Sequence, residues 1–189
     1  WGLLYKFVLA NLAYKVMSLV MAKTILQVLA YSYAYGIYMF FDFAGYSLMA
    51  IGTGYMLGIK VPENFNKPFI STDFWARWHI SLSEWFRDFI FTRFIMSSMK
   101  KKRFKTRLTT ASVGFIINMF VMGIWHGLAI QYLVYGLYHG VLLALTEIYQ
   151  KKSKFYKKNK KKRWYKIVSW AITMNFVMFG FLIFSGHII

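Results

Sequence analysis

The chain has 189 residues, of which 58% are hydrophobic and only 16% are charged, yet its formal net charge is +18. A soluble globular domain hardly combines such apolarity with such a charge, so the composition indicates a membrane protein. Because the sequence contains no cysteine, disulfides, thiolate metal sites and a cysteine acyl-enzyme within this chain are excluded.

Two apolar stretches open the chain. Residues 3–22 are about as long as the roughly 20 residues that cross a bilayer as a helix. Residues 24–59 are too long for one span, and we expect two spans, or one span and a re-entrant piece, divided near Asp42 and Gly45. The first residues already lie inside an apolar span, so we expect the chain to be the C-terminal part of a longer membrane protein.

An amphipathic helix is predicted for residues 74–90. Ser71, Thr72 and Asp73 precede it as a plausible helix start. At about 100° per residue, large apolar side chains share one face; these are Trp75, Trp78, Leu82, Trp85, Phe86 and Phe89. We therefore expect the helix to lie at the membrane surface or to line a protein interior.

His79 falls inside that apolar face by the same spacing. A buried imidazole must find a hydrogen-bond partner or it costs free energy. Taken alone, such a histidine favours a structural role, but a second histidine in a similar setting shifts the balance toward function.

Two short segments hold most of the positive charge. Residues 100–107 carry six basic groups and residues 151–163 carry nine, and neither segment contains an acidic residue. The positive-inside rule predicts that both are cytoplasmic loops. Nucleic-acid binding is the rival interpretation, but the segments that flank these loops are predicted to be membrane spans, so loops beside anionic lipid are favoured.

The chain between these loops must cross the membrane and return. Residues 109–126 and 128–148 are predicted as the two spans, and residues 166–184 as a last one. The turn falls at Trp125, His126 and Gly127. His126 is expected near the end away from the basic loops if both pieces span fully, or deeper in the membrane if they are short or broken. An imidazole that exchanges a proton near pH 7 is unusual at the edge of a span, so His126 indicates chemistry inside a membrane.

Other polar residues of the spans have weaker signals. We expect His139 to have a packing or polar-network role, and Asn118 and Glu147 to make polar contacts between helices. The four histidines lie far apart in sequence and do not share helical metal spacing, so no metal site is predicted. The predicted fold is all-α: a polytopic transmembrane helical bundle with amphipathic or re-entrant helices, and residues 1–189 form one membrane-embedded domain.

Three motifs in order resemble the membrane-bound O-acyltransferase family. They are YMFFDFAGYS at residues 38–47, FWARWHISLS at 74–83 followed by WFRD at 85–88, and GIWHG at 123–127. Within the family, the chain is most similar to the branch that transfers D-alanine in teichoic-acid D-alanylation. The alginate O-acetyltransferase branch follows Arg-Asp with a YIPLGG-like sequence, whereas residues 89–96 read FIFTRFIM.

The resemblance implies part of that family's fold and an acyltransferase activity. The family's invariant histidine matches His126, its second signature residue matches His79, and the acid of its first motif matches Asp42. Trp78 and Trp125 precede the two histidines as supporting residues. A neutral imidazole suits the chemistry, because acyl transfer to a hydroxyl needs a base to accept the hydroxyl proton.

The roles of these residues remain separate hypotheses. His126 is expected to be the base, and direct transfer is simpler than a covalent intermediate on Ser81 or Ser83. His79 either orients the acyl donor, stabilises the developing oxyanion, or is a structural hydrogen-bond partner. Asp42 is expected to fix a helix or pair with a basic residue.

The resemblance also implies the donor and the partners. The donor would be D-alanine on the phosphopantetheine thioester of a small acidic carrier protein, so this chain itself binds no cofactor. Teichoic acid would be the acceptor, other proteins of the D-alanylation system would be partners, and the location would be the plasma membrane of a Gram-positive bacterium.

A docking surface for the carrier is predicted on the cytoplasmic side. Apolar residues close the amphipathic helix and basic residues follow at once; the predicted set is Ile95, Met96, Met99, Arg103 and Arg107. Positive-inside topology alone explains the charge equally well.

A non-catalytic transporter or channel subunit for an activated alanyl or lipid-linked group is the alternative function. Polar residues within spans fit transport as well as catalysis. The two histidines discriminate between the hypotheses, because transport does not specially require them.

Overall fold

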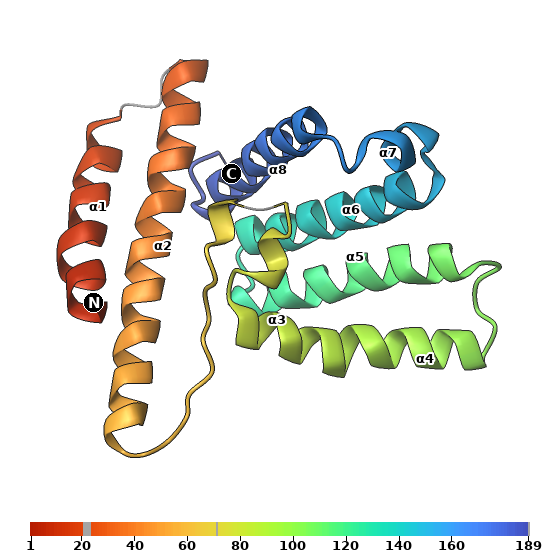
Figure 1. Ribbon diagram of the computed structural model, residues 1–189, viewed down its shortest axis with the longest axis horizontal. Helices are drawn as coiled ribbons and strands as arrows, with labels where there is room; N and C mark the ends of the chain where they lie inside the picture. The colour runs from red at the N-terminus through yellow and green to blue at the C-terminus, as the bar shows by residue number, and fades with distance from the viewer. Residues whose placement is uncertain (21–23, 71, 189) are drawn as a thin grey trace.

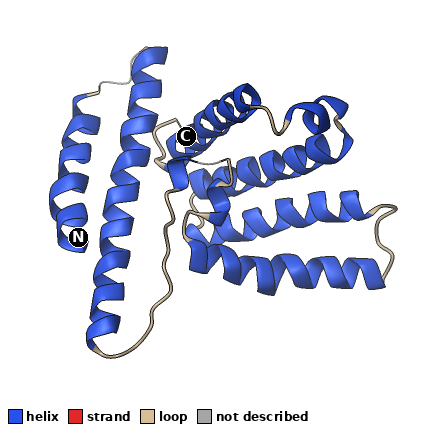
Figure 2. Ribbon diagram, viewed as in Figure 1, coloured by secondary structure: helices blue, strands red, loops and turns tan. Residues whose placement is uncertain are grey.

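Helices make up the computed structural model, which describes residues 1–20, 24–70 and 72–188. The described residues contain no strand, only one isolated bridge between Phe65 and Trp78, so the all-α prediction is confirmed (Figure 2). The elements in chain order are η1 Leu4–Leu9, α1 Ala10–Leu19, α2 Ile25–Met56, η2 Pro68–Ile70, η3 Phe74–Ala76, α3 Ile80–Phe86, η4 Arg87–Phe91, α4 Thr92–Lys100, α5 Arg107–His126, α6 Ile130–Lys152, α7 Lys154–Asn159 and α8 Arg163–Phe184.

The helices form two groups that α8 joins. The antiparallel pair α1 and α2 stands at one side, and α4, α5 and α6 lie side by side at the other (Figure 1). Helix α8 contacts both α2 and α6. Around this junction, Phe74, Trp78, Met178 and Phe181 form the core, and Phe40 of α2 packs against it.

Helix α2 runs without a break through Asp42 and Gly45, so the predicted division of residues 24–59 is wrong. Gly45 allows a close approach instead of a bend: a Cβ there would lie 2.5 Å from the backbone nitrogen of Lys6. The Lys6 ammonium pairs with the Asp42 carboxylate at 2.6 Å. At 1.5 Å per residue, α2 is about 48 Å long, more than the roughly 30 Å of the hydrocarbon core.

The predicted amphipathic helix over residues 74–90 is interrupted. After the short helix η3 the chain leaves helical geometry, and His79 adopts a left-handed conformation with φ +47° just before α3. The segment 64–66 pairs with this turn, because Asn66 N–H donates to Arg77 O and Ile80 N–H donates to Asn64 O, both at 3.0 Å. This tertiary pairing overrides the local periodicity. Ser71, part of the predicted helix start, lies outside the described residues.

Helices α5 and α6 form the predicted hairpin, with its turn directly after His126. Gly127 has φ +153°, which favours glycine, and a Cβ on it would lie 2.9 Å from the Tyr132 ring. Where α5 and α6 face each other, the Cα of Gly136 lies 3.2 Å from the position that a Gly123 Cβ would take. Small residues therefore allow the two helices to pack closely.

Helices α5 and α8 are the described helices long and apolar enough to cross a membrane. The other predicted spans do not meet the same criterion within the described ranges, and residues 21 and 22 of the first one lie outside them. Helix α6 packs on both α5 and α8. It therefore belongs to the same bundle as the two candidate spans.

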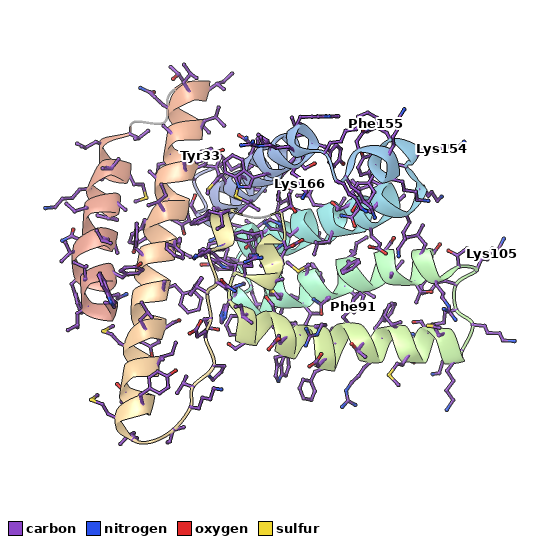
Figure 3. The ribbon with its side chains drawn as sticks, viewed as in Figure 1. Tyr33, Phe91, Lys105, Lys154, Phe155 and Lys166 are labelled. Atoms are coloured by element: carbon purple, nitrogen blue, oxygen red, sulfur yellow. The ribbon has the colours of Figure 1, made fainter. Side chains whose placement is uncertain are left out.

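Both basic segments lie at one end of the bundle, as Figure 3 shows for Lys105 and Lys154. This arrangement agrees with the prediction that the two segments face the same side of the membrane. The second segment is not a simple loop, since it contains α7. The hydroxyl of Ser153 accepts a hydrogen bond from Tyr156 N–H at 3.1 Å and caps this helix.

Candidate active site

His79 and His126 line one small cavity, about 50 Å³ in volume, although 47 positions separate them in the sequence. Four parts of the fold supply its walls: α2, the segment from η3 to α3, the α5–α6 hairpin and α8. The lining residues are mostly apolar and aromatic: Met39, Phe43, Trp75, Trp78, His79, Leu82, Ser83, Met122, His126, Tyr135, Phe181 and Phe184. The structure thus brings the two predicted catalytic residues together.

His126 is the last residue of α5 and is half-buried. Its ring makes edge contacts with Phe184, at 5.1 Å between centroids, and with Trp125, at 5.0 Å. The ring centroid of Tyr135, on α6, lies 6.3 Å from that of His126. Helix α8 therefore closes the cavity over the imidazole, and the Gly127 turn ends α5 at this residue.

His79 lines the same cavity and contacts α2. Its ring meets Phe43 edge to face at 4.5 Å and Trp125 at 6.3 Å between centroids. Its Nδ1 atom is buried and has no hydrogen-bond partner in the described part of the chain. Burial, with a smaller contribution from His126, lowers the pKa of His79 to about 4. The imidazole is therefore neutral near pH 7.

Asn64 holds the turn that carries His79. Its Oδ1 accepts hydrogen bonds from the Ser81 hydroxyl at 2.6 Å and from Ser81 N–H at 3.3 Å. Its Nδ2 donates to the hydroxyl of Ser47 on α2 at 3.4 Å. With the backbone bond from Ile80 to Asn64 O, this side chain connects three segments around His79. Sequence reasoning missed it, because it lies in a loop without regular periodicity.

The predicted supporting residues occupy three different settings. Trp78 is 5% exposed and lies among the aromatic rings of the core. Trp125 is 56% exposed but touches both histidine rings. Asp42 does not line the cavity and pairs with Lys6, in agreement with the expected structural role.

Of the five residues predicted for carrier docking, four are exposed and Ile95 is partly buried. Met96 and Met99 are 66% and 45% exposed, and Arg103 and Arg107 are also exposed. Ile95 is turned toward α5, where its Cδ1 lies 3.0 Å from the position of a Cβ on Gly114. Ile95 is therefore packed partly against α5, whereas Met96 and Met99 face outward. Carrier docking at these residues stays a prediction.

A second, larger chamber of about 430 Å³ adjoins the histidine cavity. Trp75, Ser83 and Met122 line both. The chamber extends between α3, η4 and α5 as far as Phe91, labelled in Figure 3, and Phe115, whose rings stack at 4.7 Å. It therefore leads from the histidines toward the end of the bundle that carries the basic segments.

The three polar residues with weaker sequence signals have different environments in the structure. Asn118 lines the larger chamber and its Oδ1 lacks a hydrogen-bond partner among the described residues, so the expected contact between helices is not formed. The Glu147 carboxylate pairs with Lys151 of its own helix at 3.9 Å. His139 is 3% exposed and its ring packs against Trp75 and Tyr135. In the ranges that the structure describes, no three potential ligand residues gather as a metal site.

Comparison with known proteins gives one consistent family. The model of the membrane-bound O-acyltransferase family matches residues 1–188. "Teichoic acid D-alanyltransferase" of Bacillus subtilis (strain 168) is 50% identical over 98% of this chain and 49% of its own length. The protein of that name from Streptococcus thermophilus (strain ATCC BAA-250 / LMG 18311) is 44% identical, over 99% of this chain and 50% of its own length.

The names of less similar relatives indicate a different acyl group. "Probable alginate O-acetylase AlgI" of Pseudomonas fluorescens is 41% identical over 82% of this chain and 29% of its own length. The chain spans about half the length of the D-alanyltransferases that it matches.

Proposed function

Because the chain belongs to the membrane-bound O-acyltransferase family, we propose that it forms part of the active site of an enzyme that transfers D-alanine to teichoic acid. The observation that carries the proposal is the pair of histidines, His79 and His126, in one small apolar cavity. The names of the most similar relatives support D-alanine as the acyl group and teichoic acid as the acceptor.

His126 acts as the general base. Its neutral imidazole accepts the proton of the acceptor hydroxyl while that oxygen forms a bond to the thioester carbonyl carbon. The carbon–sulfur bond then breaks, and the thiolate takes the proton from the imidazolium. Such a base typically contributes about 10² to 10⁴ in rate. Apolar walls around His126 limit access of water, which would hydrolyse the thioester.

His79 stabilises the carbonyl oxygen of the reacting thioester. Its Nδ1 is buried without a protein partner, which disfavours the purely structural role. A neutral imidazole that carries its proton on a nitrogen facing the cavity can donate a hydrogen bond to the developing oxyanion. Trp125 touches both histidine rings and keeps them at a fixed spacing.

The donor is a D-alanyl thioester on the phosphopantetheine arm of an acidic carrier protein, and it enters from the basic end. The larger chamber extends from the histidine cavity in that direction and offers room for an extended arm. Met96, Met99, Arg103 and Arg107 form an exposed apolar and cationic patch at this end. Such a patch suits a small acidic partner by electrostatic steering. The enzyme spans the bacterial plasma membrane several times.

Reconstitution of the full-length protein with alanyl-loaded carrier protein tests the proposal. We expect covalent D-alanine on lipoteichoic acid with the wild-type protein. Movement of alanine or of a lipid-linked group across the bilayer without acylation would select the transporter hypothesis instead.

A further inference from the structure

Asn118 is a buried polar side chain whose Oδ1 the described residues leave without a hydrogen bond. It lies on α5, is 9% exposed, and its Oδ1 has no hydrogen-bond partner among the described residues. A buried acceptor without a partner costs free energy, so such atoms usually meet a ligand or a water. The other polar side chains of the larger chamber are engaged: Ser83 donates to Trp78 O at 3.3 Å, and Arg87 pairs with Glu84 at 3.8 Å.

The distance between Asn118 and His126 along α5 determines which part of a bound ligand can meet Asn118. Both residues are on α5, eight positions apart, which corresponds to about 12 Å along the helix axis. The chamber that Asn118 lines and the cavity that His126 lines share Trp75, Ser83 and Met122. A ligand whose reacting atom lies beside His126 therefore passes Asn118 if it extends through the chamber.

A pantetheine arm carries two amides at fixed distances from its thioester. The nitrogen of the second amide is eight bonds from the thioester carbonyl carbon. Three bonds of an extended chain span about 3.5 Å, so this distance is roughly 9 Å. With a few ångströms between the carbonyl carbon and the imidazole, this amide reaches the level of Asn118. The first amide is too close to the thioester to do so.

We propose that Asn118 binds the acyl donor by accepting a hydrogen bond on its Oδ1 from the N–H of the second pantetheine amide. This contact sets how far the arm enters the chamber, and so places the thioester carbonyl beside His126 and His79. The inference rests on the proposed function, because it assumes a carrier-borne D-alanyl thioester as the donor.

A chemical change in the arm, combined with a change in the protein, tests the contact. One carrier is loaded with the natural D-alanyl arm, and another with an arm in which an ester oxygen replaces the second amide N–H. The full-length wild-type protein should use the ester arm about tenfold less efficiently in kcat/KM. The Asn118→Leu substitution should lower kcat/KM for the natural arm by a similar factor. The Asn118→Leu protein should also use both arms equally, since the ester arm and the substitution each remove the same hydrogen bond.

Ser98→Ala is the matched control, because Ser98 is also buried with an unpartnered hydroxyl but lies outside both cavities. It should distinguish the two arms as the wild type does. If Asn118→Leu fails to fold, Asn118→Ala replaces it in the same comparison. Equal use of both arms by the wild type, or continued discrimination by the Asn118 variants, would overturn the inference. A wild-type protein that transfers no alanine from the natural arm would instead refute the proposed function.

Discussion

The two cavity histidines are held in different ways by the backbone. His126 ends a regular helix before a glycine with φ +153°. The WHG motif and the flanking apolar stretches were sufficient to predict that turn. His79 adopts φ +47°, an unfavourable conformation for a residue other than glycine. The sequence could not reveal this, because the helical periodicity continues through residues 75–89 and only the pairing with residues 64–66 interrupts it.

Replacing His79 tests its role at the residue scale. Because burial lowers the pKa of His79 to about 4, it becomes imidazolium mainly near and below pH 4 and stays neutral between pH 5.5 and 8. If it donates a hydrogen bond to the oxyanion, His79→Gln should reduce kcat by about 10²-fold. The pH of half-maximal rate should stay unchanged in a profile of transfer by the full-length protein. A shift of the acidic limb, or full activity, would contradict this role.

At the scale of the elements, loop 64–66 orders the turn that carries His79. Asn64 binds Ser81 through its side chain and Ile80 through its backbone, and it reaches Ser47 on α2. A loop of this kind has no periodic pattern from which its contacts could be predicted. The hairpin of α5 and α6 was predictable because charge and hydropathy define its ends. The continuity of α2 could not be predicted. Gly45 is required for the close approach of the Lys6 backbone and does not bend α2.

Replacing Asn64 should misplace His79 without altering donor binding. Asn64→Leu removes the bonds to Ser81 and Ser47, and we expect kcat to fall about 10- to 100-fold, since a displacement of about 1 Å at a catalytic group has this effect. The KM for loaded carrier should change little. Asn64→Asp keeps the acceptor for Ser81 and should restore most of the rate.

Asn66→Ala is the control for this element, because both hydrogen bonds of Asn66 involve only its backbone. It should retain the wild-type rate in the same transfer assay. A rise in KM with unchanged kcat in Asn64→Leu would show that the loop affects binding and not the position of His79.

At the scale of the whole molecule, the basic segments and the cavity with the two histidines are separated along the bundle. The basic segments 100–107 and 151–163 lie at one end, as Lys105 and Lys154 show in Figure 3. His126, which lines the small cavity, is at the opposite end of α5. The sequence was sufficient to predict this polarity, because the positive-inside rule depends on where Lys and Arg lie between the apolar segments. It could not predict the larger chamber, whose walls come from segments that pack together only in three dimensions.

The polarity predicts where the proposed acidic carrier protein binds. Arg103→Glu with Arg107→Glu should weaken retention of the acidic carrier about tenfold in pull-down at low salt. Lys157→Glu with Lys158→Glu changes the net charge equally but on α7, away from Met96 and Met99, and should have a clearly smaller effect. Equal losses with both pairs would indicate general attraction by the basic end, without a defined docking surface.

The catalytic role of His126 is tested most directly by D-alanine transfer with matched histidine variants. The full-length protein is reconstituted with loaded carrier, and covalent D-alanine on lipoteichoic acid is measured for wild type, His126→Gln and His187→Gln. His187 is exposed and does not line the cavity, so its variant should keep the wild-type rate. His126→Gln should lose transfer by about 10²-fold or more. Full transfer activity in His126→Gln would contradict the assignment of His126 as the base.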